Sequence, residues 1–390
     1  MTSRLAALVA ALSLGGAHAA AAQSVSDALT FLLTNQGVQT GSVERDREAA
    51  LATSNTISRG LVVNLATLPV PSSSTAFLYR LNPELGTVER ASESFGPFFI
   101  ERALTAGRGQ ISFGFTVQQF HFTSLDGREL RDGSLITTAN QFVDESEPFD
   151  VDRLTLDLDA NVTTFYGNVG VTNRVEVGFA VPLVSLFLDG SRENVYRGQR
   201  FTQATARARA TGLADVLVRT KVKVYEEEGA ALAGAVDVRL PTGSTDDLLG
   251  AGSSSIRFAG IGSIEGQHLS GHVNLGYTFG GLADEVSFGG AVAVAATPRL
   301  SIIAEALGRS IDSPGGIVPI AAAHPTLRDV QTIRLAPGRS RLNIISVAPG
   351  IKWNIADTWV LSANVGMPLT NTALAAPFTP FIGLDFALGR

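Results

Sequence analysis

The residues of this sequence that could do chemistry are charged and polar side chains spaced two positions apart. Asp157 and Asp159 alternate with leucines, and Lys221 and Lys223 alternate with valines further along the chain. In an extended strand this spacing places both members of a pair on the same face. Rows of this kind that line an enclosed space can contact a solute, or they can pair with one another across that space. The chemistry they predict is non-covalent binding.

We take the apolar positions of each extended segment as the outward ones, so that the polar positions face an interior. Both signs of charge occur on neighbouring segments, and many of these groups could therefore form structural pairs instead of contacting a solute. Small residues such as Ala231, Ala233 and Ala235 lie among them and leave room, which suits a small organic solute better than a wide ion pore. The candidate interior residues are Asp157, Asp159, Glu176, Asp215, Arg219, Lys221, Lys223, Asp237, Arg239, Arg257, His272, Asn274, Glu305, Arg309 and Asp385.

Motifs for covalent catalysis are absent from the sequence. It contains no HExxH, no Walker loop, no Gly-x-Ser-x-Gly elbow and no cysteine. A barrel-embedded lipid hydrolase stays open as an alternative, because it needs only a serine and a histidine near the outer rim. The pairs available are His272 with Ser270, both inward by the same alternation, and His121 with Ser124, which has no obvious orienting carboxylate. We expect no enzyme activity, no cofactor and no bound metal.

The elements that must position these residues are extended segments with a repeat of two. In Leu269–Phe279, the residues Leu269, Val273, Leu275, Tyr277 and Phe279 share one face, and Ser270, His272, Asn274 and Thr278 share the other. Similar segments lie near 108–122, 152–166, 174–187, 213–224, 230–240, 255–264, 269–280, 285–296, 299–310, 341–354, 358–368 and 377–388. They number about twelve, and single-chain bacterial barrels have an even number of strands.

The connections between these segments are alternately short and long. Tight connections fall at Val171–Asn173, Glu226–Gly229, Glu265–Gln267, Thr297–Pro298 and Ala356–Asp357, and longer ones near 123–151, 188–212, 241–254, 311–340 and 369–376. The link at 281–284 is short where a long loop was due. Outer-membrane barrels have short periplasmic turns and long outer loops, a pattern for which a Greek-key sandwich gives no reason. The sequence therefore predicts an all-β fold, an up-and-down antiparallel transmembrane β-barrel of about twelve strands over residues 108–390.

The amino terminus has the three parts of a secretory signal peptide. Arg4 precedes the apolar run Leu5–Leu14, and the small residues Ala17–Ala22 offer cleavage sites, so residues 1–22 are assigned to it. No later window approaches the ~18 apolar residues of a spanning helix. We expect a location in the bacterial outer membrane with membrane lipid as a partner. A net charge of -6 argues against a nucleic-acid partner.

Residues 23–107 differ from the rest of the chain. Ser24–Asn35 and Ser42–Ser54 are expected to be short helices, and the mixed segment that follows ends in the phenylalanine-rich stretch Phe95–Phe99. Two interpretations of this segment stay open. It is either a plug folded into the lumen or mouth of the barrel, or a periplasmic extension that packs on the rim.

Several strand and turn residues resemble the landmarks of a known family. Gly212-Leu-Ala-Asp215 leads into Val216–Val224, and Arg239-Leu-Pro-Thr-Gly243 precedes Gly250-Ala-Gly252. Later landmarks are Asn274-Leu-Gly-Tyr277, Thr297-Pro-Arg-Leu300 with Glu305, Ala348-Pro-Gly350 and Gly366-Met-Pro-Leu-Thr370. Over about residues 210–370 they resemble the outer-membrane barrels associated with meta-pathway degradation of phenol and similar aromatics. Ala214-Asp215 departs from the Gly-Asp usual in that family.

The resemblance implies the barrel fold and the transport of small hydrophobic compounds, but none of its landmarks is a binding residue that can be carried over. The function we expect is therefore passive passage of small hydrophobic or aromatic molecules. A structural or surface-interaction barrel with a lumen filled by side chains is the main alternative. The oligomeric state and the direction of passage stay open.

Overall fold

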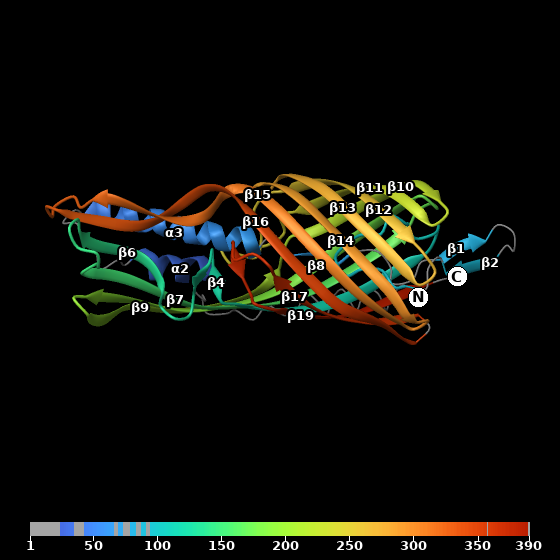
Figure 1. Ribbon diagram of the computed structural model, residues 1–390, viewed down its shortest axis with the longest axis horizontal. Coiled ribbons are helices and arrows are strands. Elements are labelled where there is room, and N and C mark those ends of the chain that lie inside the picture. The colour runs from blue at the N-terminus through green and yellow to red at the C-terminus, as the bar shows by residue number, and fades with distance from the viewer. Residues whose placement is uncertain are drawn as a thin grey trace, which may run out of the picture.

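Twelve strands close into one antiparallel barrel in this computed structural model, which describes residues 24–34, 43–65, 69–72, 79–82, 87–90, 94–356 and 358–388 (Figure 1). The strands are β3 (Ile111–Phe122), β7 (Asp150–Gly170), β8 (Val175–Tyr196), β10 (Val216–Glu227), β11 (Ala230–Leu240), β12 (Ser255–Glu265), β13 (Leu269–Gly280), β14 (Asp284–Thr297), β15 (Leu300–Ala323), β16 (Val330–Ala356), β17 (Trp359–Pro368) and β19 (Thr379–Leu388). Pairing of β19 with β3 closes the ring. The predicted up-and-down barrel of about twelve strands is confirmed.

The outer face of the barrel is apolar. On β13, Val273 and Leu275 are 62% and 63% exposed, whereas the alternating residues His272 and Asn274 are buried. The same alternation runs through β12 and β14. Hydrocarbon offers no partner to polar groups, so a spanning strand directs its apolar side chains outward and its polar ones inward. No helix in the described part of the chain has the length and apolar character needed to cross a membrane.

At the end opposite the short turns, the barrel continues into an open sheet that we call the extension. It consists of the far parts of β7, β8, β15 and β16, joined by β6 (Leu135–Phe142) and β9 (Gln199–Leu213). Short strands β4 (Ser124–Leu125), β5 (Arg128–Glu129) and β18 (Leu374–Ala375) pair beside it. Much of the chain near 123–151, 188–212 and 311–340, which was expected to form long loops, therefore consists of strands.

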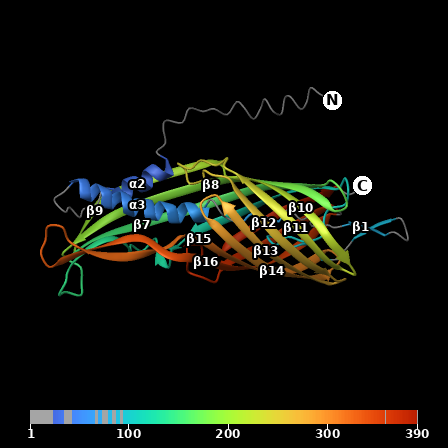
Figure 2. The same cartoon turned by 90° about the horizontal axis from the view of Figure 1, so that it is seen from above.

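Two helices lie along the extension, as both views show (Figures 1 and 2). Helix α2 (Val25–Thr34) begins at Ser24, whose Oγ accepts a hydrogen bond from the Asp27 amide at 3.0 Å, as an N-cap residue does. Its buried Leu29 and Leu32 belong to one core with Leu156 of β7 and leucines of β8. The extension thus has its apolar face inward, around the helices.

Helix α3 (Val43–Leu65) is longer than the expected helix that ended at Ser54. The polar and β-branched residues after Ser54 lower helix propensity and hide the continuation. Ile57, Leu61 and Leu65 nevertheless follow at spacings of four and are buried in the same core, so tertiary packing extends the helix. A hairpin of β1 (Tyr79–Asn82) and β2 (Thr87–Arg90) lies beyond the end of the barrel that carries the short turns (Figure 1). The predicted signal peptide lies outside the described residues.

Candidate functional site

The residues Ser94–Gly107 run inside the turn end of the barrel, and we call them the lumen segment. They form neither a helix nor a strand, so their backbone groups need partners from elsewhere. Inward-facing side chains of the barrel supply them. The amide of Phe95 donates to Ser301 Oγ at 3.0 Å, that of Ala103 to Ser263 Oγ at 2.8 Å, and that of Ala106 to Glu176 Oε2 at 2.7 Å. The barrel wall therefore holds the lumen segment by specific hydrogen bonds.

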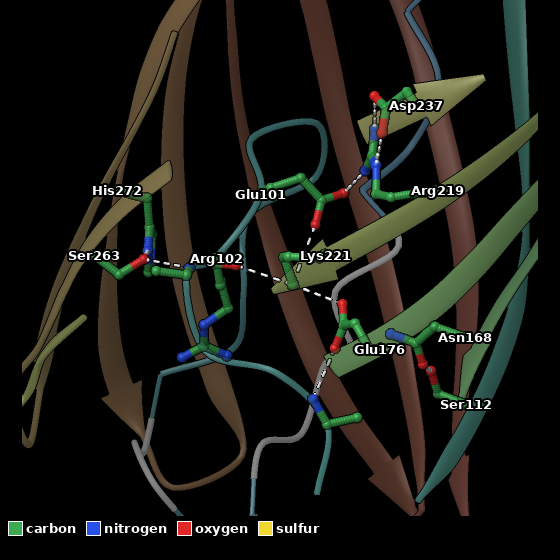
Figure 3. Close-up of polar contacts among 12 residues, drawn as sticks. Glu101, Arg102, Ser112, Asn168, Glu176, Arg219, Lys221, Asp237, Ser263 and His272 are labelled. Carbon is green, nitrogen blue, oxygen red and sulfur yellow. Dashed lines mark hydrogen bonds and ion pairs between the residues drawn. The ribbon is translucent and has the colours of Figure 1, made fainter. Parts of the chain in front are cut away.

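A buried ionic network joins the lumen segment to β10 and β11 (Figure 3). The Arg219 guanidinium binds both carboxylate oxygens of Asp237, at 2.6 and 2.7 Å, and its remaining terminal nitrogen contacts Glu101 of the lumen segment. Lys221 Nζ lies 2.7 Å from Glu176 and donates to the carbonyl of Arg102 at 3.0 Å. Bidentate arginine contacts of this kind are strong and fix geometry. Each sign of charge is matched locally, as burial requires.

A second set of contacts lies on β12 and β13. Arg102 binds Glu265 through two nitrogens, at 2.9 and 2.8 Å. His272 lies 2.9 Å from Ser263 Oγ and 3.3 Å from Ser270 Oγ. The Asn274 amide accepts from the Glu101 N–H at 2.7 Å and donates to its carbonyl at 3.0 Å.

Glu305 of β15 binds three successive amides of the lumen segment. It accepts hydrogen bonds from the N–H groups of Phe98, Phe99 and Ile100, the last two at 3.0 and 3.2 Å. Lys352 of β16 donates to the Pro97 carbonyl at 2.9 Å, and its Nζ lies 5.3 Å from the centre of the Phe98 ring. Three hydrogen bonds to the one carboxyl group of Glu305, together with the Lys352 contact, fix the bend at Pro97–Ile100.

A cavity of about 320 Å³ lies between the lumen segment and the end of α3. Phe99 and Ile100 bound it on one side, and Val63 and Asn64 of α3 on the other. Its wall is chemically divided. Inward-facing aromatic residues line it from β3 and β19, whereas charged residues line it from β10, β11, β12, β14 and β15: Phe120, Phe122, Phe381, Arg219, Asp237, Arg239, Arg257, Glu285 and Arg309. Phe288 of β14 also borders the cavity, but it belongs to the exposed outer face.

The structure divides the expected interior residues into groups. Glu176, Arg219, Lys221, Asn274 and Glu305 contact the lumen segment, and Arg219 and Asn274 also line the cavity together with Asp237, Arg239, Arg257 and Arg309. His272 is buried beside them.

Three further candidates have local partners. Asp385 accepts from Tyr166 Oη at 2.5 Å and Ser362 Oγ at 3.3 Å. Asp215 lies in the break between β9 and β10 and accepts from the amides of Gly243 and Ala251, at 3.0 and 2.8 Å. Lys223 lies 2.6 Å from Glu226 at the turn end.

The expectation that Asp157 and Asp159 face the lumen is wrong. They lie on the outer face of the extension, where Arg131 contacts Asp157 and His121 Nδ1 lies 2.5 Å from Asp159. The intervening Leu158 is buried in the core around α2 and α3. Outside the hydrocarbon, a strand that covers helices turns its apolar face to them and its charges to water. The rule that assigned apolar positions to the outside therefore reverses in this part of β7.

The expected interior residues omitted several residues of the site, although the sequence contained a signal for two of them. Lys352 alternates with Ile351 and Trp353, so the repeat of two in 341–354 contains the signal that places it inward. Glu285 lies two positions from Ser287 in β14, so the same repeat places its side chain inward. Glu101 and Arg102 lie in coil, and no periodic signal could have placed them.

The arrangement around His272 differs from what hydrolysis requires. Ser270, His272 and Glu265 are neighbours, yet Glu265 is bound by Arg102, and His272 Nδ1 is closer to Ser263 at 2.9 Å than to Glu265 at 3.9 Å. His121 does have a carboxylate beside it, Asp159, contrary to the expectation.

Comparison with known proteins gives distant similarities among solved structures. No curated protein matches the chain. Among solved structures, an outer membrane channel from Pseudomonas putida F1 is 12% identical, with 73% of this chain and 98% of that chain covered and a TM-score of 0.46. The NanC porin is 7% identical, with 70% and 100% covered and a TM-score of 0.37. The outer membrane protease OmpT from Escherichia coli is 10% identical, with 72% and 97% covered and a TM-score of 0.29.

A family model provides the assignment that these distant structures do not. Residues 136–375, more than half of the chain, match the family described as "Putative MetA-pathway of phenol degradation". The matched range runs from the second residue of β6 to the end of β18 and includes every described arginine and carboxylate of the cavity wall. The chain belongs to this family of outer-membrane β-barrels associated with phenol degradation.

Proposed function

We propose that this protein is an outer-membrane channel for the passive passage of small hydrophobic or aromatic molecules. The observation that carries the proposal is the cavity of about 320 Å³ inside the barrel, bounded by aromatic side chains on one wall and by the lumen segment at the turn end. Its volume is at the lower end of the usual range for ligand pockets. No covalent step is part of the proposal.

The lumen segment acts as the closure of this channel. It is attached to the wall by hydrogen bonds and ion pairs, for example from Glu305 to the amides at Phe98–Ile100 and from Lys221 to the Arg102 carbonyl. Water can replace contacts of this type when the segment moves, whereas it cannot replace a packed apolar core at low cost. By the usual orientation of such barrels the short turns face the periplasm, so the closure lies on the periplasmic side.

Passage follows from exchange of similar contacts. A solute that enters the cavity exchanges its contacts with water for contacts of similar strength with aromatic and polar wall groups, so that both entry and exit are permitted. The extension and its helices stand at the outer end and leave the cavity bounded there by Val63 and Asn64.

Liposomes that carry the purified protein test the proposal. They should admit small aromatic solutes faster than empty liposomes, and deletion of residues 23–107 should raise the rate further. Folding of both proteins is checked by a heat-modifiable band on gels, which in isolated outer membranes also tests the location. A folded deletion variant that seals as tightly as empty lipid would contradict both closure and passage and would leave a structural role for the barrel.

A further inference from the structure

We propose that the cavity selects small aromatic carboxylates over neutral and cationic aromatics of the same shape. This inference rests on the proposed passage and assigns its substrate class. It depends on three features of the cavity: the sign of its net charge, the ion pairs that its arginines form and the position of its aromatic wall.

The described cavity wall carries an excess of positive charge. Four arginines line it, against two carboxylates: Arg219, Arg239, Arg257, Arg309, Asp237 and Glu285. Glu101, which contacts Arg219, and Asp215, which lies near Arg239 and accepts from the amides of Gly243 and Ala251, do not line the cavity, so the surface that a solute would meet keeps the excess. A cleft lined by one sign of charge in low-dielectric surroundings concentrates solutes of the opposite sign. The wall therefore favours an anion.

The carboxylates of the wall are already engaged by particular arginines. Asp237 is bound through both oxygens by Arg219, and Glu285 is bound by Arg309 at 2.9 and 2.5 Å. Arg257 has a single contact to Asp237, at 3.1 Å, and directs its Nε to Ser287 Oγ at 3.1 Å. Its guanidinium has five N–H donors in a planar fork that matches a carboxylate. Arg257 is thus placed to bind the carboxylate of a solute without breaking a bidentate pair.

Arg239 lies on β11, next to the strand β12 that carries Arg257. It lies within electrostatic reach of three carboxylates, Asp215, Asp237 and Glu285, and of the like-charged Arg309. Each of the three carboxylates is also bound by other groups. Its charge adds to that of Arg257 at the same wall. We assign Arg239 and Arg257 as the pair that sets the preference for an anion.

The aromatic wall lies across the lumen from these arginines. The pairing order of the closed ring places β3 and β19, which carry Phe120, Phe122 and Phe381, on the opposite side from β12 and β13. A solute with a ring at one end and a carboxylate at the other can contact both walls at once. An ionised carboxylate also cannot enter hydrocarbon cheaply, so such a solute needs a channel where a neutral aromatic does not.

Three probes of one shape and different charge test the selectivity. Benzoate, benzamide and benzamidinium share a ring and a planar head group and differ in charge. Uptake of each is measured at pH 8 in liposomes containing the full-length protein, with empty liposomes subtracted. Benzoate should enter about tenfold faster than benzamidinium, with benzamide between them. Unlabelled benzoate should slow the uptake of labelled benzoate more than equal acetate does, because acetate lacks the ring.

Charge-removing variants locate the effect. The double variant Arg239→Gln with Arg257→Gln should lower benzoate uptake about tenfold relative to benzamide uptake. Asp237 keeps its bidentate partner Arg219 in this variant. Arg207→Gln removes one charge from the exposed outer face of the extension and should leave the preference intact.

The outcomes separate this inference from the proposed passage. Equal uptake of the three probes, equal competition by acetate, or an unchanged preference in the folded double variant would overturn the inference while passage stands. If no probe enters, passage fails, and calorimetry with the detergent-solubilised protein decides the selectivity. Binding of benzoate but not of benzamidinium supports it, and absence of benzoate binding overturns it.

Discussion

At the scale of single residues, the inner wall of the barrel is organised by charges that bind each other and the lumen segment. Asp237 and Glu305 illustrate the two roles. Asp237 fixes Arg219 and Arg257 within the wall, whereas Glu305 binds backbone amides of a segment that the barrel does not otherwise hold by strands. Loss of the first should affect the stability of the barrel, and loss of the second should affect its closure.

The Asp237 site yields a prediction about stability. Arg219→Gln removes the bidentate partner of Asp237 and the arginine that contacts Glu101. Removal of one member of a buried ion pair lowers the free energy of unfolding by about 3 to 5 kcal/mol. The temperature at which the barrel loses its compact form on gels should fall clearly. Arg207→Gln serves as the matched control, because it removes an exposed ion pair that contributes about 0 to 1 kcal/mol. This variant should not change the temperature. An equal temperature for both variants would contradict the structural role of Arg219.

The Glu305 site yields a prediction about closure. Glu305→Gln replaces a charged acceptor by a neutral amide whose NH₂ group is repelled by the backbone N–H groups. Each charge-assisted bond is worth about 1.5 to 3 kcal/mol, so the open fraction should rise about tenfold or more. Single-channel recording should show longer openings, without loss of the folded band. Glu129→Gln, on exposed β5, should behave like the wild type; unchanged openings in Glu305→Gln would remove Glu305 as an attachment.

At the scale of elements, alternation alone predicts strands but does not state which face meets which environment. Leu269–Phe279 and Arg153–Asp159 have the same repeat of two, and each forms a strand. The apolar face of the first meets lipid and that of the second meets α2, because the helices replace hydrocarbon as the apolar partner. The sequence thus predicted the twelve strands and most inward residues of β10 to β15.

The remaining part of the site could not be predicted because its positions depend on distant partners. Glu101 and Arg102 belong to coil, whose path is determined by Arg219, Glu265 and the serines of the wall. These partners are distant in the chain: Arg219 is 118 residues from Glu101, and Glu265 is 163 residues from Arg102. Periodicity carries no information about such contacts. Lys352 did carry a periodic signal, since it alternates with outward residues.

The inverted face of the extension leads to a prediction about α2. Leu29→Ala removes a fully buried side chain from the core of the extension, at a cost of about 2 to 5 kcal/mol. Limited proteolysis should cleave the region 24–65 faster while the barrel fragment survives. Phe31→Ala, from the exposed side of the same helix, is the control and should be cleaved like the wild type. Equal cleavage of both variants would contradict the packing of α2 in the extension.

At the scale of the whole molecule, the membrane boundary separates the barrel from the extension. Leu275→Arg places a charge on the lipid-facing side of β13 and should cost about 2 to 4 kcal/mol if that position lies near the midplane, so less protein should fold into bilayers. Thr205→Arg lies on the exposed face of β9 in the extension and should fold normally. Equal folding yields would contradict the placement of the hydrocarbon around the twelve strands.

The central claim is that the lumen is a passage closed by the lumen segment, and a reversible crosslink tests it most directly. The chain has no cysteine, and Ser94 Oγ lies 2.7 Å from Ser270 Oγ, so Ser94→Cys with Ser270→Cys can join the segment to β13 by a single disulfide. Uptake of benzoate by liposomes should stop on oxidation and return on reduction, with either single variant insensitive to both treatments. Uptake that continues unchanged in the fully oxidised protein would contradict the account.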